Sequence, residues 1–358
     1  MAPLGLPGYR STAAYCFDEE QADGIIRTTA YHRRDFCLAV IWYSPREHFV
    51  IRSSIATPFD QTANAGFGAL DRLPLELLYN TFFHMDMQSL FKFRQINRMS
   101  RKMVDCLNQY ELVATHGLNL FCTLLRTRLA SRISLLDFYN ALCTKACTLC
   151  GEFGGFISLP SWTRCCFKCL QEAPETQVQT LASARKQFHL TQVELDRLTS
   201  FKTLPGIYTM EESKYKRRIA IVSSHQAMLA SKRQSHEPTQ AQPSNPERNN
   251  KFNFMGSCAL SYYDKQNDKI EDGISCVGCQ LSLEKKLLGN SAENGTGPEK
   301  WAFDVRDKVY SRAGLLEHFR WCEQAQLLWT SSDEGKIMPP DLFSHRFAYN
   351  KLQFMTDS

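Results

Sequence analysis

Residues 70–110 constrain the fold most strongly, because their apolar side chains recur at helical spacing in three successive segments. Pro74 suits the first turn of a helix, where the N–H that proline lacks would have no partner. Asp86 can cap a second helix, and a third follows it with Met99 and Met103 on one face. A helical module of about 40 residues buries little surface by itself. We therefore expect it to need a partner protein or a neighbouring domain.

Two interpretations of this module compete. Most amphipathic helices bury their apolar stripe in their own core, which would make it an ordinary helical hairpin. Its motifs resemble an F-box instead: Leu73-Pro74-x-Glu76, Phe82-Phe83, Met85-Asp86, Leu90, Asn97-Arg98 and Val104. The resemblance implies docking onto the Skp-type adaptor and cullin of an SCF ubiquitin ligase. Carried over to this chain, it implies that six residues face the adaptor or support that face: Leu73, Pro74, Leu77, Leu78, Leu90 and Ile96.

Composition sets the remaining bounds. A chain of 358 residues with 43% hydrophobic and 22% charged residues has globular values and room for two or three domains. Its net charge of +5 does not by itself indicate nucleic acid or membrane binding, and no apolar run approaches a membrane span. The amino terminus lacks a secretory pattern, so the fourteen cysteines are expected to be reduced. These features predict an intracellular protein of the cytoplasm, the nucleus or both.

The first predicted metal site is formed by two Cys-x-x-Cys pairs, Cys147 with Cys150 and Cys166 with Cys169. Fifteen residues separate the pairs, which is typical of a four-cysteine zinc site. Four thiolates give Zn²⁺ a closed tetrahedral shell. Cys165 competes with Cys166 for the third ligand position. Several free buried cysteines would be the alternative, but it explains two spaced pairs poorly.

A second, longer-range set predicts another zinc ion. It consists of Cys276, Cys279, His318 and Cys322. His318 and Cys322 are four residues apart in a helix expected over residues 311–329, which places them on one face. The alternative is a partly buried histidine beside a core cysteine. Both ligand sets are complete without water, so they predict two structural Zn²⁺ ions rather than a catalytic one.

A wider resemblance covers about residues 67–330. The order F-box, cysteine-rich module, then Cys-x-x-Cys and His-x-x-x-Cys ending near Trp329, is similar to a group of filamentous-fungal F-box proteins. The resemblance implies a substrate-recognition subunit of an SCF ligase, with an undefined protein substrate.

The fold class expected is α+β, mainly α, with an F-box three-helix module, two small zinc-stapled elements and short strands. The expected segments are a poorly defined extension (1–66), the F-box (67–113), a helical region with the four-cysteine knuckle (114–230), a disordered linker (231–251), the second zinc element with a C-terminal helix (252–332) and a tail (333–358). Residues 36–43 and 254–263 are expected as strands, and residues 289–300 as a loop.

Two other classes of function are nucleic-acid or scaffold binding and catalysis. The basic patch of Lys214, Lys216, Arg217 and Arg218 near Tyr215 fits a zinc-dependent nucleic-acid-binding or scaffold protein, although such a patch is usually a solvated face. The modest net charge argues against nucleic acid as a partner. The sequence contains no Gly-rich phosphate loop, nucleophile-elbow serine or HExxH motif, so we expect a non-catalytic adaptor.

Overall fold

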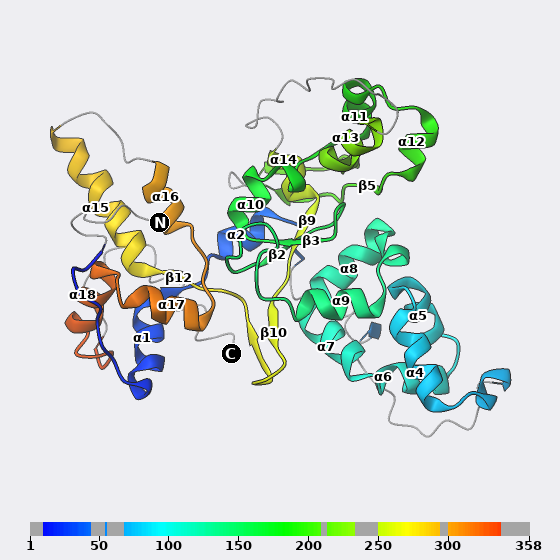
Figure 1. Cartoon of the computed structure of the whole chain (residues 1–358), viewed down its shortest axis with the longest axis horizontal. Coiled ribbons are helices and arrows are strands. Elements are labelled where there is room, and N and C mark those ends of the chain that lie inside the picture. The colour runs from blue at the N-terminus through cyan, green and yellow to red at the C-terminus, as the bar shows by residue number, and fades with distance from the viewer. Residues whose placement is uncertain are drawn as a thin grey trace. The chain divides into compact units, whose positions relative to one another are not determined.

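The computed structural model describes residues 10–43, 54–55, 68–208, 213–232, 250–293 and 300–337. It is mainly helical, with short antiparallel strand pairs, which confirms the fold class expected from the sequence. The chain divides into two compact units (Figure 1). Unit 1 comes from Met1–Arg34 and Glu271–Ser358, and unit 2 from Asp35–Ile270. No helix among the described residues has the length and apolar character needed to cross a membrane.

Unit 2 begins within α2 (Arg34–Ala39) and continues with the helices of the 70–110 stretch. These are the short η2 (Gly68–Arg72), then α4 (Leu75–His84), α5 (Met87–Arg94), α6 (Arg98–Asp105) and α7 (Asn108–His116). Asp86 caps α5 by accepting a hydrogen bond from the Ser89 N–H, as expected. Asn97 caps α6 in the same way through Ser100. Pro74 lies one residue earlier than expected, at the N-cap of α4.

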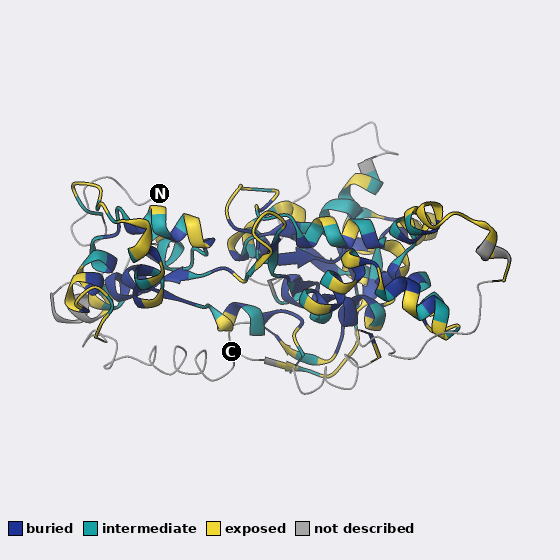
Figure 2. Ribbon diagram, turned by 90° about the horizontal axis from the view of Figure 1, so that it is seen from below, coloured by how far each residue is buried: buried dark blue, intermediate teal, exposed yellow. Residues whose placement is uncertain are grey.

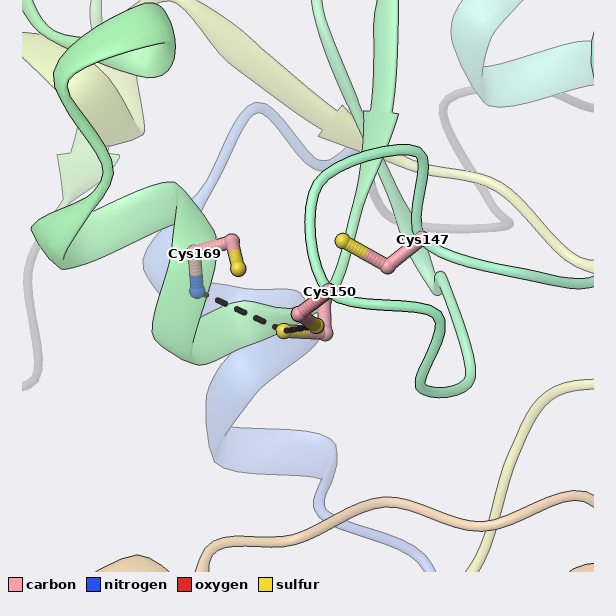
Figure 3. Close-up of side chains that lie close together, drawn as sticks. Cys147, Cys150 and Cys169 are labelled. Atoms are coloured by element: carbon pink, nitrogen blue, oxygen red, sulfur yellow. Dashed lines mark hydrogen bonds between the residues drawn. The ribbon is translucent and has the colours of Figure 1, made fainter.

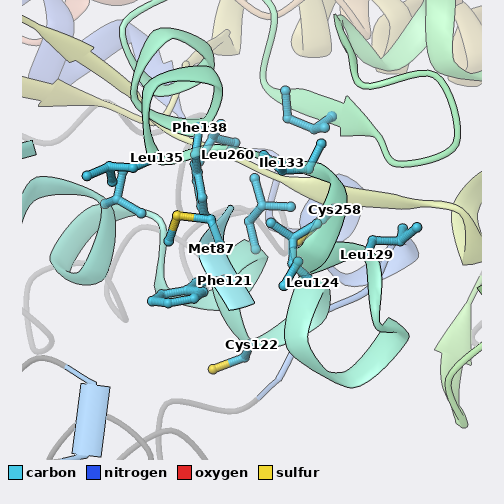
Figure 4. Close-up of a cluster of buried hydrophobic side chains, with 14 of the residues drawn as sticks. Met87, Phe121, Cys122, Leu124, Leu129, Ile133, Leu135, Phe138, Cys258 and Leu260 are labelled. Atoms are coloured by element: carbon cyan, nitrogen blue, oxygen red, sulfur yellow. The ribbon is translucent and has the colours of Figure 1, made fainter. Parts of the chain in front are cut away.

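The next helices cover the 70–110 module. They are α8 (Leu118–Thr127), η3 (Leu129–Arg132) and α9 (Leu135–Leu142). The Met87 N–H donates to the Ile133 carbonyl and the Leu135 N–H donates to the Met85 carbonyl, so the α4–α5 turn is bound to the start of α9. Figure 4 shows the resulting core, in which Met87 of α5 lies among apolar side chains of α8 and α9. Cys258 and Leu260, from far along the chain, belong to the same core.

Two three-stranded sheets complete unit 2. The first has the order β3-β2-β9 and the second β4-β8-β5, all antiparallel. Their strands are β2 (Phe156–Ser158), β3 (Thr163–Cys165), β4 (Val178–Thr180), β5 (Ser200–Lys202), β8 (Ala220–Ser223) and β9 (Ser257–Ala259). The two hairpins are β6 (Gly206–Tyr208) with β7 (Ser213–Tyr215), and β10 (Tyr262–Asp264) with β11 (Lys269–Glu271). The remaining helices are α10 (Phe167–Glu172), η4 (Pro174–Thr176), α11 (Leu181–Phe188), α12 (Gln192–Arg197), α13 (Ser224–Lys232) and α14 (Asn250–Met255).

Unit 1 brings the two ends of the described chain together. Strand β1 (Ala30–Tyr31) pairs antiparallel with β12 (Ser275–Cys276). Helix α1 (Ala22–Thr29) packs against α17 and α18, and Trp329 lies in the shared core with Ile25 and Phe319. The elements are η1 (Glu19–Gln21), α1, β1, β12, α15 (Val277–Glu293), α16 (Lys300–Arg306), α17 (Arg312–Phe319) and α18 (Glu323–Ser331). Within each unit the buried residues concentrate inside, and exposed residues lie on outer helical faces (Figure 2).

Several sequence expectations were wrong locally. Residues 36–43 do not form a strand, because α2 ends at Ala39 and only Ile41 bridges to Cys258. Residues 254–263 contain the end of α14 and two short strands instead of one. The helix α15 extends to Glu293, so residues 289–293 are not a loop.

The helix expected over residues 311–329 is two helices, α17 and α18. The backbone of Cys322 is extended, with φ −89° and ψ 99°, and Cys322 serves as the N-cap of α18. Apolar periodicity runs through the break because both helices contribute to the core of unit 1.

The two units do not coincide with the segments expected from the sequence. Residues 10–34, expected as part of a poorly defined extension, form η1, α1 and β1 of unit 1. Strand β9 pairs with β2 in unit 2, although it was expected in the second zinc element. Most of the expected linker, residues 233–249, lies outside the described residues, as does the tail from residue 338.

Candidate adaptor-docking face and metal centres

Helix α4 has apolar side chains on two faces. Leu78 and Phe82, 4% and 2% exposed, point into the core of unit 2. Leu75 and Leu77 are each 53% exposed, and Leu73 just before the helix is 42% exposed. Burial of Leu78 and Phe82 explains why the helix packs, but it does not account for the outer leucines. The outer face is therefore available to another protein.

The other residues predicted to meet an adaptor divide in the same way. Ile96, in the turn between α5 and α6, is 69% exposed, and Pro74 is exposed. Leu90 is completely buried in the core of unit 2. Leu73, Pro74, Leu77 and Ile96 are thus at the surface, whereas Leu78 and Leu90 lie beneath it.

A buried ion pair that sequence reasoning missed holds α5 against α6. Arg94 is 1% exposed, and its Nε and Nη2 donate to the two carboxylate oxygens of Asp105 at 2.6 and 3.2 Å. Nη1 of Arg94 also donates to the carbonyl of Ser54. Burial raises the pKa of Asp105, and the Arg94 guanidinium opposes that shift. The only sequence signal was a basic residue directly after the apolar Phe93 in a short helix.

The first cysteine cluster consists of Cys147, Cys150, Cys166 and Cys169, whose sulfur atoms all lie within 4.8 Å of one another. Cys147 and Cys150 flank a tight turn in which the Gly151 N–H donates to the Cys147 carbonyl at 2.9 Å. Gly151 has φ +78°, which glycine adopts without strain. Cys166 is the N-cap of α10, and its sulfur accepts a hydrogen bond from the Cys169 N–H at 3.4 Å. The spacing predicted from the sequence therefore brings these four side chains together.

Figure 3 shows Cys147 and Cys150 on the turn facing Cys169 on α10. Cys150 is exposed, Cys166 and Cys169 are half-buried, and Cys147 is buried. The Sγ atoms of Cys150 and Cys166 are 3.6 Å apart. The first cluster thus has one side open to solvent.

The structure separates Cys166 from Cys165, an alternative that the sequence left open. Cys165 ends strand β3 and is completely buried, with its side chain in the core rather than in the cluster. Burial raises the pKa of the Cys165 thiol. Cys143, the C-cap of α9, is also outside the cluster.

Arg164 joins the first cluster to the rest of unit 2 and was not identified from the sequence. It is 3% exposed, and its Nε donates to the Gly154 carbonyl at 2.6 Å. Nη1 donates to the carbonyl of Ala141 at 2.6 Å, and Nη2 donates to those of Leu260 and Ser261 at 3.0 and 3.1 Å. One side chain therefore connects the cysteine turn, the end of α9 and the segment after β9. Burial lowers its pKa to about 10, so it is still charged at neutral pH.

The second cluster consists of Cys276, Cys279, His318 and Cys322, and its ligand atoms likewise lie within 4.8 Å of one another. The Cys279 sulfur is 3.2 Å from Nε2 of His318, and the Cys276 and Cys322 sulfurs are 3.7 Å apart. The three cysteines are buried. The ring of His318 stacks on Tyr310 with centroids 4.8 Å apart, which orients Nε2 toward the sulfurs.

Gly278 permits the close packing that forms the second cluster. A Cβ at this position would lie 2.4 Å from the Ala325 backbone nitrogen. Helix α15, which carries Cys279, can therefore approach α18, which begins after Cys322, only with glycine here.

In each cluster, hydrogen bonding between the thiols lowers the pKa of one cysteine and raises that of another. The pKa of Cys147 is lowered to about 4 because its sulfur accepts a hydrogen bond from Cys166, whose own pKa is raised by the same contact. In the second cluster the pKa of Cys276 is lowered by hydrogen bonds from Cys279 and Cys322, and the same contacts with Cys276 raise the pKa values of Cys279 and Cys322. A metal ion can replace the remaining thiol protons, since thiolates are the form that binds metal. Four sulfurs, or three sulfurs and one imidazole, match the closed ligand sets of structural zinc.

Comparison with known protein families gives one match. Residues 70–112 match the F-box domain, a range that includes α4, α5 and α6 and most of α7. No curated protein and no solved structure matches the chain. Residues 70–112 therefore form an F-box domain, which implies a subunit of an SCF ubiquitin ligase that binds a Skp-type adaptor.

Proposed function

We propose that this chain is the non-catalytic substrate-recognition subunit of an SCF ubiquitin ligase. The observation that carries the proposal is the solvent-exposed apolar face of Leu73, Leu75 and Leu77 at the start of the matched domain. An apolar side chain buried at an interface contributes on the order of 1.5–3 kcal/mol, so a few such leucines suffice for a stable contact. Leu78 and Leu90 support this face from below, and Ile96 extends it.

The proposal assigns substrate binding to the region after the F-box. Arg164 connects the first cysteine cluster to α9, which itself contacts α4. A substrate bound to unit 2 would thus be held in fixed geometry relative to the adaptor, and ubiquitin transfer by other subunits would gain from proximity.

We also propose that each cluster holds one structural Zn²⁺ ion. The reduced thiols that this requires fit the cytoplasm or the nucleus. The order of F-box, four-cysteine cluster and Cys₃His cluster supports grouping the chain with the filamentous-fungal F-box proteins.

The experiment that tests adaptor docking uses exposed positions only. We expect the wild-type chain to co-elute with a purified Skp-type adaptor in size-exclusion chromatography. The double variant Leu75→Glu, Leu77→Glu should bind the adaptor at least about a hundredfold more weakly, because two apolar contacts of about 1.5 kcal/mol or more are lost. Leu78 is unsuitable because its burial would make a polar variant a test of folding. Val193→Glu is the matched control, since Val193 is an apolar residue of α12 in the same unit and is 61% exposed. Unchanged adaptor affinity in the double variant would contradict the assigned face.

A further inference from the structure

The first cysteine cluster differs from the second in its access to solvent. Its members are Cys147, Cys150, Cys166 and Cys169, and Cys150 is exposed. The three cysteines of the second cluster are buried. A reagent dissolved in water can therefore reach a sulfur of the first cluster directly, whereas the sulfurs of the second cluster are shielded. Solvent access is one of the two properties that decide which cysteines are oxidised, and thiolate character is the other.

Cys150 also has a second thiol beside it. The Sγ atoms of Cys150 and Cys166 are 3.6 Å apart, and Cys166 is half-buried at the N-cap of α10. Cys16 and Cys106 are exposed too, but neither belongs to a cluster of the described residues. An oxidised cysteine with a thiol in reach proceeds to a disulfide, whereas one without such a thiol stops at the sulfenic acid or is oxidised irreversibly. Cys150 and Cys166 thus have the arrangement of an exposed reactive cysteine and its resolving partner.

The turn of the first cluster is attached to the rest of unit 2 by hydrogen bonds that do not involve a metal. The N–H and the hydroxyl of Thr148 both donate to the Arg164 carbonyl at 3.0 Å. Within the turn, the Cys147 N–H donates to the Glu152 carbonyl at 2.6 Å. These bonds hold the turn against β3 when a metal ion leaves. The cysteine side chains therefore stay near one another, and the site can be reloaded.

We propose that Cys150 and Cys166 are a peroxide-oxidised pair whose reversible disulfide empties the first cluster of its zinc ion. The proposal rests on the zinc occupancy proposed above and adds a modification site to it. The second cluster keeps its ion under the same conditions, because its cysteines are buried. Oxidation thus changes unit 2 through one site and leaves unit 1 loaded.

The chemistry consumes one hydroperoxide for each disulfide. The Cys150 thiolate attacks one peroxide oxygen, the O–O bond breaks, and a sulfenic acid forms as hydroxide or an alkoxide leaves. The Cys166 thiolate then attacks the Cys150 sulfur, so that an S–S bond forms, the S–O bond breaks and hydroxide leaves. The two sulfurs supply the two electrons that reduce the peroxide. The disulfide removes two of the four ligands of Zn²⁺, and a dithiol reductant restores both thiols by exchange.

Elemental analysis of the full-length zinc-loaded protein tests the loss of metal. After treatment with hydrogen peroxide and desalting, we expect the zinc content to fall from two ions per chain to about one. Dithiothreitol with added zinc should restore the second ion. Cys106→Ser is the matched control, because it removes an exposed thiol outside both clusters and should leave this loss unchanged.

Peptide mapping identifies the disulfide. The remaining thiols are alkylated before digestion, and trypsin then places Cys166 and Cys169 in different peptides, because it cleaves the bond before Cys169. We expect a link between the peptides of residues 146–164 and 165–168 that disappears on reduction. Fragmentation of the linked pair should assign the bond to Cys150.

Dimedone, which traps sulfenic acids, separates the roles of the two cysteines. In Cys166→Ala the sulfenic acid of Cys150 should accumulate, so labelling at Cys150 should rise at least about threefold over wild type. Labelling at exposed Cys106 is the internal control and should be the same in both proteins. This readout does not need bound zinc in the variant. Equal labelling of Cys150 in the two proteins would overturn the resolving role of Cys166.

The outcomes separate this inference from the proposed zinc sites. Retention of both ions at a peroxide dose that labels Cys106 would overturn the inference, and so would a disulfide between any other pair of cysteines. A chain that carries no zinc before peroxide treatment would instead contradict the zinc sites themselves. In that case the peptide link would still decide whether Cys150 and Cys166 form the oxidised pair.

Discussion

Replacing Arg164 by methionine should destabilise unit 2 more than any single surface change. The side chain donates to four carbonyls, those of Ala141, Gly154, Leu260 and Ser261. Each buried acceptor left without a donor costs about 1 kcal/mol or more, which gives roughly 4 kcal/mol for the set. Removing the buried guanidinium also recovers part of its own desolvation cost, so roughly 4 kcal/mol is an upper value for the net loss. A loss of this size is a large fraction of the stability of an ordinary domain.

Hydrogen exchange followed by mass spectrometry tests this prediction at the segments that Arg164 contacts. In Arg164→Met, peptides covering residues 141–165 and 254–261 should lose protection, whereas peptides of unit 1 should be unchanged. Arg164→Lys should give a smaller loss, because lysine keeps the charge but cannot reach four acceptors in the guanidinium geometry. Arg185→Met, at an exposed position of α11, is the control. A change of less than about 1 kcal/mol in the urea unfolding free energy of Arg164→Met would refute the clamp role.

Two other predictions concern the cysteine clusters. Gly278→Ala should lower the stability of unit 1 and its metal affinity, because the new Cβ would lie 2.4 Å from the Ala325 backbone nitrogen. Gly155→Ala is the control and should be close to neutral, because its Cβ would have only Phe153 nearby, at 3.8 Å. Equal shifts of the thermal unfolding midpoint in the two variants would contradict the packing argument. Elemental analysis should find two zinc ions per chain, and a coloured zinc chelator should remove them in two phases, with the first cluster faster because Cys150 is exposed and the cysteines of the second cluster are buried. Cys150→Ser should abolish the fast phase and Cys279→Ser the slow one. Absence of zinc with an unchanged unfolding transition in chelator would show that these cysteines only pack.

The sequence by itself determined the features that depend on a few neighbouring residues. The helical spacing of residues 70–110 and the Asp86 cap are local, and the structure confirms them. The Cys-x-x-Cys pairs are local as well, because each pair forms a single turn that aims two sulfurs at one point. Cysteine and histidine spacing in the sequence also predicted the members of both clusters that the fold brings together.

Only the tertiary structure decided how distant segments combine. Residues 10–34 belong to one unit with residues 271–337, and β9 pairs with β2 although residues 159–256 separate them in sequence. Buried apolar surface and unpaired strand edges can be satisfied by a segment from any part of the chain. The buried positions of Arg164 and Arg94 also depend on the tertiary structure, because a buried cation needs hydrogen-bond acceptors. Arg164 finds them in the carbonyls of Ala141 and Leu260, and Arg94 in the carboxylate of Asp105, all distant in sequence. The break before α18 is of this kind too, because apolar periodicity continues across Cys322 while the backbone turns there to place its sulfur in the second cluster.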